Sequence, residues 1–482
     1  MPSFTNLTRG NEIGANSYLL ELDRQRVILD AGMHPKLTGS AATPALPRSA
    51  ARRADAIFLT HAHLDHAGCL PLAQLAQPDA PVFMSPPTRH LAEPLLFNSV
   101  NVMQRQREEL NISEYPLFTR HDVHEAMKKW RVCPLNRWHN LGGEPIEPKE
   151  LARRHGDAEL SLIKKTPRLR ANQAIFRFHH AGHILGSVMI ELQAADRRIL
   201  YTGDLCLHDQ TLMMSAAVPP GPFDLLVVET TRGAQPSERG VTRGLVEQEL
   251  LAAIRTVFAR GGAVLIPIFA LGKTQEILAM LHRARRRGDL PADTVPHIGG
   301  LGKVFTQAYD ATADFSARAH RELDLLRDIR PQIFDLRKIA RFKPRRGHLY
   351  LLPSGMMTEN TTSNIIASHF LAHAEDAIFF VGYSDPDSPA GRLRRALADG
   401  DGRVTLNPRH GEQPIRSEVR YFDFTSHADR EDLLNFIVSL APKNIALVHG
   451  DTAALAWFRQ AIPQHLPAAN IFIPESGQRI EF

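Results

Sequence analysis

Residues 59–70 read LTHAHLDHAGCL, and within them His61, His63, Asp65 and His66 form the pattern H-x-H-x-D-H. An apolar, strand-like segment at 56–59 precedes the pattern, and a helix-like run follows it. In extended backbone, alternate side chains share one side, so the first three of these residues would point the same way. His66 would reach a second ion where the chain turns. Imidazole nitrogens and carboxylate oxygens are ligands that zinc accepts, so this spacing predicts a metal site rather than a solvated polar loop.

Length and composition restrict the class of protein. The chain has 482 residues, of which 43% are hydrophobic and 23% charged, which predicts a globular protein of two or three domains. No apolar run approaches the length of a membrane span, and the first residues lack the pattern of a secretory signal. The three cysteines are scattered and form no disulfide framework. We therefore expect a cytoplasmic protein without a membrane partner.

Positive charge is concentrated in the middle of the chain. The net charge is +5, and basic residues gather at 283–287 (RARRR) and 337–346 (RKIARFKPRR). Such an excess fits an anionic substrate but is too small to establish one. A charge run is also typical of a solvated face, so both interpretations stay open.

Strand-like segments are followed by polar residues that carry chemistry. Two short strands are expected within 17–30 and another at 81–84, after which 86–172 is polar and mostly helical in pattern. Strands then resume at 175–179, 188–193, 198–202 and 224–229. His183 follows the first of these strands, Asp204 follows the third, and Glu229 ends the fourth. Residues at successive strand ends are a common way to build a site.

From about 234 to 416 the pattern changes to alternating helices and hydrophobic strands. Helices are expected at 245–260 and 273–287, and strands at 263–269, 349–353 and 377–382. This alternation predicts parallel strands with helices on the faces of their sheet.

Taken in order, these motifs resemble a known family. The pattern at 61–66, with His183 in GHILGS, Asp204 in YTGD and Asp30 in ILDAG, is similar to the metallo-β-lactamase superfamily. Later motifs resemble its β-CASP nuclease branch: ETTRG at 229–233, GGAVLIPIFALGKTQEIL at 261–278, PSGMMTEN at 353–360, SHADRE at 426–431 and VHGD at 448–451. The stretch 10–37 looks especially like the endonuclease subunit of the cleavage-and-polyadenylation machinery and its prokaryotic relatives.

The resemblance implies an α/β fold, a four-layer αβ/βα sandwich interrupted by a β-CASP domain. Residues 1–232 would form the first part of the metallo-β-lactamase domain, with 86–172 as a helical elaboration covering the site. Residues 233–416 would form the β-CASP cap, and 417–482 the second part of the sandwich.

The resemblance also implies the roles of the site residues. His61, His63 and His183 would hold one zinc ion, Asp65, His66 and His449 a second, and Asp204 would bridge them. Asp30 would orient a ligand imidazole. His427 would be the general acid, with Glu229 hydrogen-bonded to it. Lys273, Arg232, Ser354 and Gly355 would contact substrate, although Arg232 and Lys273 depart from the residues usual in the family. Zinc is the expected metal, and manganese could replace it in vitro.

The function implied is a ribonuclease that cuts single-stranded RNA internally, from the 5′ end, or both, in RNA processing or decay. A homodimer is a further expectation, because relatives are often dimers. The main alternative is a DNA nuclease of the same branch acting in repair. His449 argues against it, since those enzymes generally lack a histidine there. A small-molecule hydrolase and a non-catalytic scaffold subunit are weaker alternatives, because the chain has a large insert and keeps every ligand.

Overall fold

The structure is a computed structural model, and it describes residues 2–10, 12–22, 25–47, 53–146, 174–194, 196–237 and 240–482. The chain divides into two compact units. The first comprises Met1–His208, Ser215–Ser237 and His427–Phe482, and the second comprises Asp209–Met214 and Glu238–Ser426. The second unit ends later than the predicted cap domain, because β19 (Glu418–Tyr421) pairs with β16 (Ala377–Phe380) in its sheet.

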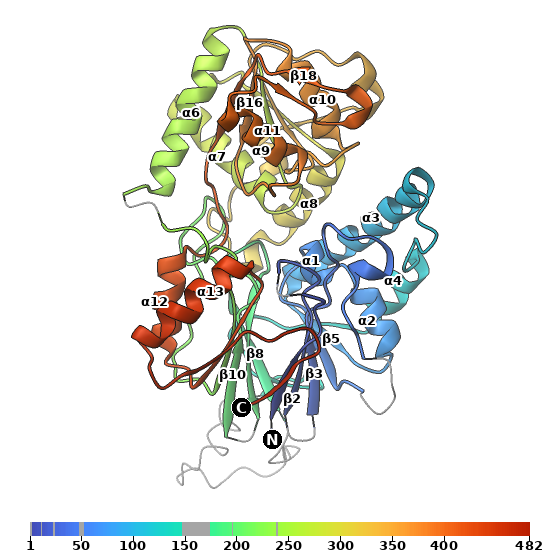
Figure 1. Cartoon of the computed structure of the whole chain (residues 1–482), viewed down its shortest axis with the longest axis vertical. Coiled ribbons are helices and arrows are strands. Elements are labelled where there is room, and N and C mark those ends of the chain that lie inside the picture. The colour runs from blue at the N-terminus through green and yellow to red at the C-terminus, as the bar shows by residue number, and fades with distance from the viewer. Residues whose placement is uncertain are drawn as a thin grey trace. The chain divides into compact units, whose positions relative to one another are not determined.

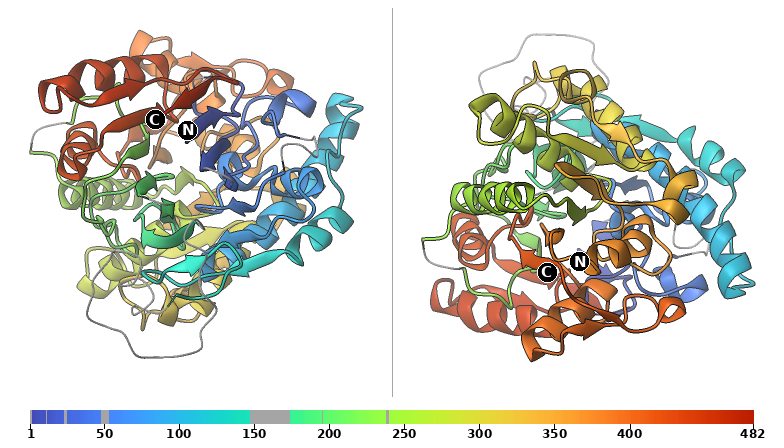
Figure 2. Two further views of the ribbon diagram at one scale, coloured as in Figure 1. Left: turned by 90° about the horizontal axis from the view of Figure 1, so that it is seen from below. Right: turned by 90° about the horizontal axis from the view of Figure 1, so that it is seen from above.

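The first unit contains two seven-stranded sheets, each partly parallel and partly antiparallel. The first sheet has the order β22-β1-β2-β3-β4-β5-β6. Its strands are β1 (Ser3–Asn6), β2 (Tyr18–Leu22), β3 (Gln25–Leu29), β4 (Ala56–Phe58), β5 (Val82–Met84), β6 (Trp130–Val132) and β22 (Arg479–Glu481). Because β1 pairs with β22, the two ends of the chain lie side by side (Figures 1 and 2).

The second sheet has the order β21-β20-β11-β10-β9-β8-β7. Its strands are β7 (His139–Asn140), β8 (Ile175–His180), β9 (Val188–Ala194), β10 (Arg197–Tyr201), β11 (Leu225–Glu229), β20 (Asn444–Val448) and β21 (Asn470–Phe472). Strands β10, β11, β20 and β21 run parallel to one another, which brings the polar residues after β10, β11 and β20 to the same edge.

The core of the first unit lies between the two sheets. Phe58 and Phe83 of the first sheet pack against Phe176 of the second, with ring centroids 4.7 and 4.8 Å apart. All three side chains are fully buried, and burying each one stabilises the fold by roughly 1.5–3 kcal/mol. The sandwich therefore forms where the two apolar faces meet.

Helices cover the outer faces of the sandwich. Leu433 and Phe436 of α12 (Arg430–Leu440) and Phe458 of α13 (Thr452–Ala461) pack on the second sheet. On the other side of the unit lie α1 (Leu64–Ala67), α2 (Leu70–Ala76), α3 (Pro86–Leu110) and α4 (Arg120–Met127) (Figures 1 and 2). The predicted four-layer αβ/βα sandwich is confirmed.

The segment predicted as a helical elaboration is only partly helical. Helix α3 begins after Ser85, whose hydroxyl accepts a hydrogen bond from Thr88 N, and α4 begins with a capping box between Thr119 and Asp122. The segment also supplies edge strands β6 and β7, whose three and two residues are too few to recognise in the sequence. The part of this prediction that falls on 147–172 lies outside the described residues.

The second unit is built around a six-stranded parallel sheet of order β14-β13-β15-β12-β16-β19, as the alternating pattern predicts. Its remaining strands are β12 (Val264–Pro267), β13 (Val295–Ile298), β14 (Gln332–Ile333) and β15 (His348–Leu352), and β17 (Arg403–Val404) and β18 (Gln413–Pro414) form a separate ribbon. Its helices are α6 (Arg243–Ala259), α7 (Lys273–Arg287), α8 (Gly300–Ala311), α9 (Leu325–Ile329), α10 (Thr362–Leu371) and α11 (Pro389–Asp399).

Among the described residues, no helix combines the length and the apolar character that a membrane span requires. The cytoplasmic location remains a prediction.

Candidate metal centre

The predicted ligands converge in the first unit from the ends of four strands. His61 and His63 follow β4, Asp65 and His66 lie in α1, His183 follows β8, Asp204 follows β10, and His449 follows β20. The 61–67 segment is held against the loop after β3, where Ala31 N donates to the His66 carbonyl at 2.8 Å. Gly32 permits this approach, because a Cβ there would lie 1.7 Å from the Asp65 carbonyl oxygen.

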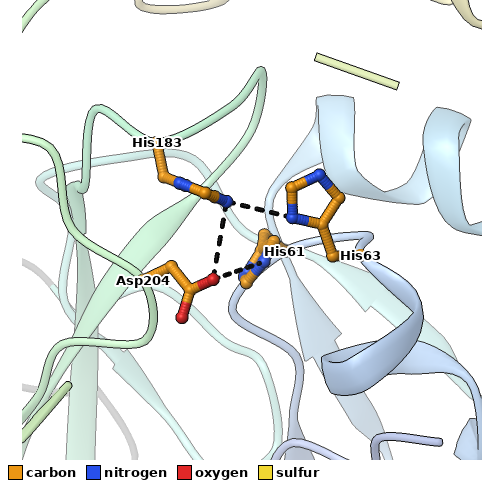
Figure 3. Close-up of side chains that lie close together, drawn as sticks. All are labelled: His61, His63, His183 and Asp204. Atoms are coloured by element: carbon orange, nitrogen blue, oxygen red, sulfur yellow. Dashed lines mark hydrogen bonds and ion pairs between the residues drawn. The ribbon is translucent and has the colours of Figure 1, made fainter. Parts of the chain in front are cut away.

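One group of donors consists of three imidazoles and a carboxylate. Nε2 of His61 and Nε2 of His183 each lie 3.5 Å from Asp204 Oδ2, and Nδ1 of His63 lies 3.0 Å from His183 Nε2. Figure 3 shows the four side chains pointing toward one another, His61 and His63 from one sheet and His183 and Asp204 from the other. The ligand atoms all lie within 4.8 Å of one another. A metal ion with tetrahedral coordination, such as zinc, accepts such a set of donors.

The second group lies on the other side of Asp204. Nε2 of His449 is 3.3 Å from Asp65 Oδ2, and Asp65, His66 and His449 form a second cluster of ligand atoms within 4.8 Å. Asp204 Oδ1 lies 3.1 Å from His66 Nε2 and 3.2 Å from His449 Nδ1. The two oxygens of Asp204 therefore face different donor groups.

The chemistry of the donors fits bound cations. Among the described residues, the buried His61 Nε2 has no hydrogen-bond partner, and the buried Asp204 Oδ1 has only the imidazole nitrogens of His66 and His449 close to it. Burial lowers the pKa of His63 to about 4, so its ring is neutral and has a free lone pair at neutral pH. Burial alone would raise the pKa of Asp65, but the His449 hydrogen bond and the charges of His66 and His449 lower it to about 2. Neutral imidazoles and ionised carboxylates are the states that bind zinc.

Asp30 lies beneath His66 and is fully buried. Its Oδ2 is 2.7 Å from His66 Nδ1 and accepts hydrogen bonds from Tyr201 Oη at 2.7 Å and Thr60 Oγ1 at 2.8 Å. Burial opposes a charge on His66, but Asp204 and Asp30 raise its pKa well above the ordinary value. The two carboxylates therefore attract positive charge at this position, and a bound cation would supply that charge in place of the ring proton.

Thr60 and Tyr201 were not recognised as site residues from the sequence. Thr60 N also donates to Asp30 Oδ1 at 2.7 Å, so the two residues together fix the carboxylate. Their only signal in the sequence is that Thr60 precedes His61 directly and Tyr201 begins the YTGD motif.

His427 and Glu229 form a pair at the edge of the first donor group. His427 Nδ1 lies 3.1 Å from both carboxylate oxygens of Glu229, which in turn accept hydrogen bonds from Leu205 N at 2.6 Å and Thr231 N at 3.3 Å. Burial would lower the pKa of His427, but the Glu229 carboxylate raises it above the ordinary value. About 21% of the His427 side chain is exposed, whereas Glu229 is buried. Such an imidazole can hold a proton and give it up on its open side.

Asp30 and His449 share an unusual backbone conformation. Their φ angles are 58° and 50°, in the left-handed region that residues other than glycine rarely adopt. Gly450, which follows His449, has no room for a side chain, because a Cβ would lie 2.1 Å from Thr230 Oγ1. These backbone angles set the directions of the Asp30 and His449 side chains, although other described residues, such as Asn111 and Ala441, also have a positive φ.

The four predicted substrate contacts are divided between the units. In the first unit, Arg232 Nε donates to Asp429 at 3.0 Å. In the second unit, Lys273 Nζ donates to the Phe424 carbonyl and, at 2.7 Å, to Ser426 Oγ. Ser354 Oγ accepts a hydrogen bond from Thr358 N at 2.9 Å. Contact with substrate remains a prediction for each of them.

Gly355 lies with two aromatic residues that the sequence did not single out. Phe269, Gly355, Lys273 and Tyr383 line one shallow depression of the second unit. Phe269 is 40% exposed and Tyr383 is 56% exposed, although both follow buried strands. A Cβ on Gly355 would lie 3.0 Å from the Phe269 ring. Exposed aromatic faces beside a cation are suited to stacking of nucleic-acid bases.

Two protein families match parts of the chain. The metallo-beta-lactamase superfamily matches residues 10–158, and the Zn-dependent metallo-hydrolase RNA specificity domain matches residues 412–474. The first range contains Asp30 and the 61–66 motif, and the second contains His427 and His449.

Curated relatives are similar over nearly the whole chain. Endoribonuclease YSH1 of Candida glabrata is 27% identical over 469 residues, which cover 95% of this chain and 56% of the relative. Cleavage and polyadenylation specificity factor 73 of Drosophila melanogaster is 25% identical over 96% of this chain and 62% of its own length. Cleavage and polyadenylation specificity factor subunit 3-I of Arabidopsis thaliana is 26% identical over 99% and 63%. The chain thus spans a little over half the length of these relatives.

A solved structure agrees in fold. A protein of unknown function from Enterococcus faecalis superposes with a TM-score of 0.54 at 13% identity, covering all of both chains. With the two family matches and the curated relatives, the resemblance to the metallo-β-lactamase superfamily and its β-CASP RNA-processing nucleases is confirmed.

Proposed function

We propose that this chain is a zinc-dependent ribonuclease that cleaves phosphodiester bonds of single-stranded RNA in RNA processing or decay. The observation that carries the proposal is the convergence of two donor groups on Asp204, with the His427–Glu229 pair beside them. His427 and His449 also fall within the range that matches an RNA specificity domain. Cleavage within the strand, from its 5′ end, or both, follows from the same chemistry.

Two zinc ions are proposed, one in each donor group. His61, His63 and His183 would hold the first, Asp65, His66 and His449 the second, and Asp204 both through its two oxygens. Bound zinc lowers the pKa of a nearby water and compensates negative charge on a phosphate. The chain itself fixes the donors: Asp30 orients His66, and Thr231 Oγ1 lies 3.0 Å from His449 Nδ1.

His427 is proposed as the general acid for the leaving oxygen. Its Nδ1 is occupied by Glu229, which leaves Nε2 to hold and donate a proton. Glu229 holds the ring in place and favours the charged imidazolium, and backbone N–H groups fix Glu229 in turn. When the P–O bond breaks, the leaving oxygen departs as an alkoxide unless it is protonated. The proton is therefore needed at the moment of bond breaking.

No observation favours the DNA-repair alternative, since one family description names RNA specificity and the names of the relatives refer to an endoribonuclease or to cleavage and polyadenylation. The homodimer and the use of manganese remain predictions.

The test is a cleavage time course with the purified full chain and zinc. Substrates are matched single-stranded RNA and DNA labelled at either end, with the RNA carrying 5′-hydroxyl, monophosphate or triphosphate termini. His427→Ala is the variant, and His465→Ala, an exposed histidine outside the centre, is the matched control.

Internal RNA fragments that are absent with His427→Ala and present with His465→Ala are the expected result for an endonuclease. A ladder from the 5′ end would assign the exonuclease mode instead. Cleavage of DNA alone, or undiminished RNA cleavage by a zinc-loaded His427→Ala protein, would refute the proposal.

A further inference from the structure

The second unit contains a large cavity away from its shallow aromatic depression. The cavity has a volume of about 1170 Å³ and lies between the last turns of α7, the loop before β13, and the segment around α9. Six arginines line it: Arg283, Arg285, Arg286, Arg287, Arg327 and Arg330. The lining carboxylates are Asp293, Glu322 and Asp328. The cavity therefore carries a net positive charge, and the RARRR run supplies most of it.

Half of these arginines are neutralised by neighbouring carboxylates. Arg283 and Arg287 pair with Glu247, Arg287 also pairs with Asp289 at 2.8 Å, and Arg327 pairs with Asp328 at 2.8 Å. Their positive charges are therefore largely compensated by carboxylates of the same unit.

The other three arginines have no carboxylate partner among the described residues. Arg285 donates to the Ile329 carbonyl at 3.5 Å, and Arg330 donates to the Arg327 carbonyl at 3.3 Å. The Arg286 side chain is exposed and makes no hydrogen bond or ion pair within the described part of the chain, although its backbone lies in α7. His282 also lines the cavity, and burial and the charges of Arg285 and Arg286 lower its pKa. Both arginine charges are therefore felt at His282, inside the cavity. Three guanidinium groups are thus available around one cavity.

The lining distinguishes between anionic ligands. Of the described residues that line the cavity, none is Phe, Tyr or Trp, so no platform exists there for stacked bases. The volume is slightly above the roughly 300–1,000 Å³ usual for small-molecule pockets, and guanidinium groups bind phosphate with paired hydrogen bonds. We propose that this cavity binds a small molecule carrying several phosphates, through Arg285, Arg286 and Arg330. This site is independent of the proposed nuclease function.

Binding is tested by titration calorimetry on the full chain, with inorganic tripolyphosphate as the probe and inorganic phosphate as a weaker comparison. Arg286→Ala removes a side chain without internal partners, so the fold should be retained. Arg285→Ala/Arg286→Ala removes two of the three guanidinium groups. Arg337→Ala is the matched control, because Arg337 is 90% exposed, pairs with Asp335 and lies in the same unit outside the cavity. None of these substitutions touches the candidate metal centre, so chelation of zinc by the probe affects all of the proteins equally.

We expect Arg286→Ala to weaken tripolyphosphate binding about tenfold and the double variant about a hundredfold, since a charge-assisted hydrogen bond contributes about 1.5–3 kcal/mol. Arg337→Ala should bind as the wild type does. Equal affinity in all four proteins, or the absence of any binding, would overturn the proposal. Binding of an RNA oligonucleotide that depends on Arg286, without binding of tripolyphosphate, would overturn it in favour of a strand-binding surface.

Discussion

The residues that follow the strand ends are buried and ionisable in the first unit but exposed and aromatic in the second. In the first unit, the ends of β4, β10, β11 and β20 carry buried groups that ionise, such as His61, Asp204, Glu229 and His449. In the second unit, the ends of β12 and β16 are followed by exposed aromatic rings, Phe269 and Tyr383. Both groups of residues lie at an edge of a sheet where parallel strands end.

This difference indicates that metal-binding side chains must be buried, whereas side chains that contact nucleic acid must be exposed. A metal centre requires donors that are desolvated and fixed, because the pKa of His63 and the orientation of His66 both depend on their surroundings. A surface that binds single-stranded nucleic acid instead needs aromatic rings whose faces are exposed to solvent. We therefore expect substitutions in the first set to change chemistry and those in the second set to change affinity.

The largest effect is expected for Asp204, which faces both donor groups. Asp204→Asn should lower the content of both metals and reduce cleavage by roughly 10³-fold or more, because several kcal/mol of charge stabilisation are lost. His63→Ala should mainly remove the metal of the first group. Metal content by mass spectrometry and cleavage rate are the measurements, with His465→Ala as control. Full metal content in Asp204→Asn would contradict the assignment of a shared ligand.

His427 should separate chemistry from metal binding. His427→Ala should keep its zinc and lose about 10²- to 10⁴-fold in kcat, the usual contribution of a general acid. Glu229 raises the pKa of His427, so the acid form persists to higher pH, and activity should fall as pH rises through that raised value. Glu229→Gln should move this fall to lower pH. A pH profile that is the same in Glu229→Gln and wild type would show that the pair does not set the protonation state.

Local spacing made the metal motif visible in the sequence, whereas long-range contacts were hidden. His61 to His66 lie within one short segment, and their chemistry is apparent from the pattern alone. The hydrogen bond from Tyr201 to Asp30 joins residues 171 positions apart, and no periodicity predicts it. Several apolar strands, such as β8, β9 and β11, were recognised because burial requires an apolar pattern, but β6 and β7 were not, because they have only three and two residues. The exposure of Phe269 and Tyr383 likewise depends on packing that only the fold determines.

A moderate effect is expected for the exposed aromatic pair. Phe269→Ala and Tyr383→Ala should each weaken RNA binding by about tenfold, since a stacked base contributes about 1–3 kcal/mol, while kcat changes little. Phe269→Trp should restore affinity, because stacking needs only a flat ring. Phe315→Ala is the matched control, as Phe315 is 55% exposed in the same unit. Fluorescence anisotropy with labelled RNA measures the affinity, and a loss of kcat at unchanged affinity would contradict a role in binding.

The smallest effect on cleavage is expected for Glu191, a buried charge of the first unit that lies outside the donor groups. Burial would raise its pKa, but hydrogen bonds from His179, Arg177 and Arg198 lower it to about 2. The carboxylate therefore stabilises the folded state above the pKa of an unfolded glutamate, about 4.3, and this contribution is lost as pH falls toward 2.

Glu191→Gln should accordingly leave cleavage at neutral pH unchanged but lower the free energy of unfolding by about 3 kcal/mol, because the partly buried Arg177 and Arg198 lose the charge of their buried partner. The difference from wild type should shrink between pH 5 and pH 2. Denaturant unfolding of the metal-free proteins at several pH values measures it, so that loss of metal in acid does not contribute. A difference that stays constant with pH would mean that packing, rather than the charge of Glu191, accounts for the stabilisation. Buried charge in this unit would then be functional only where it faces the metal donors.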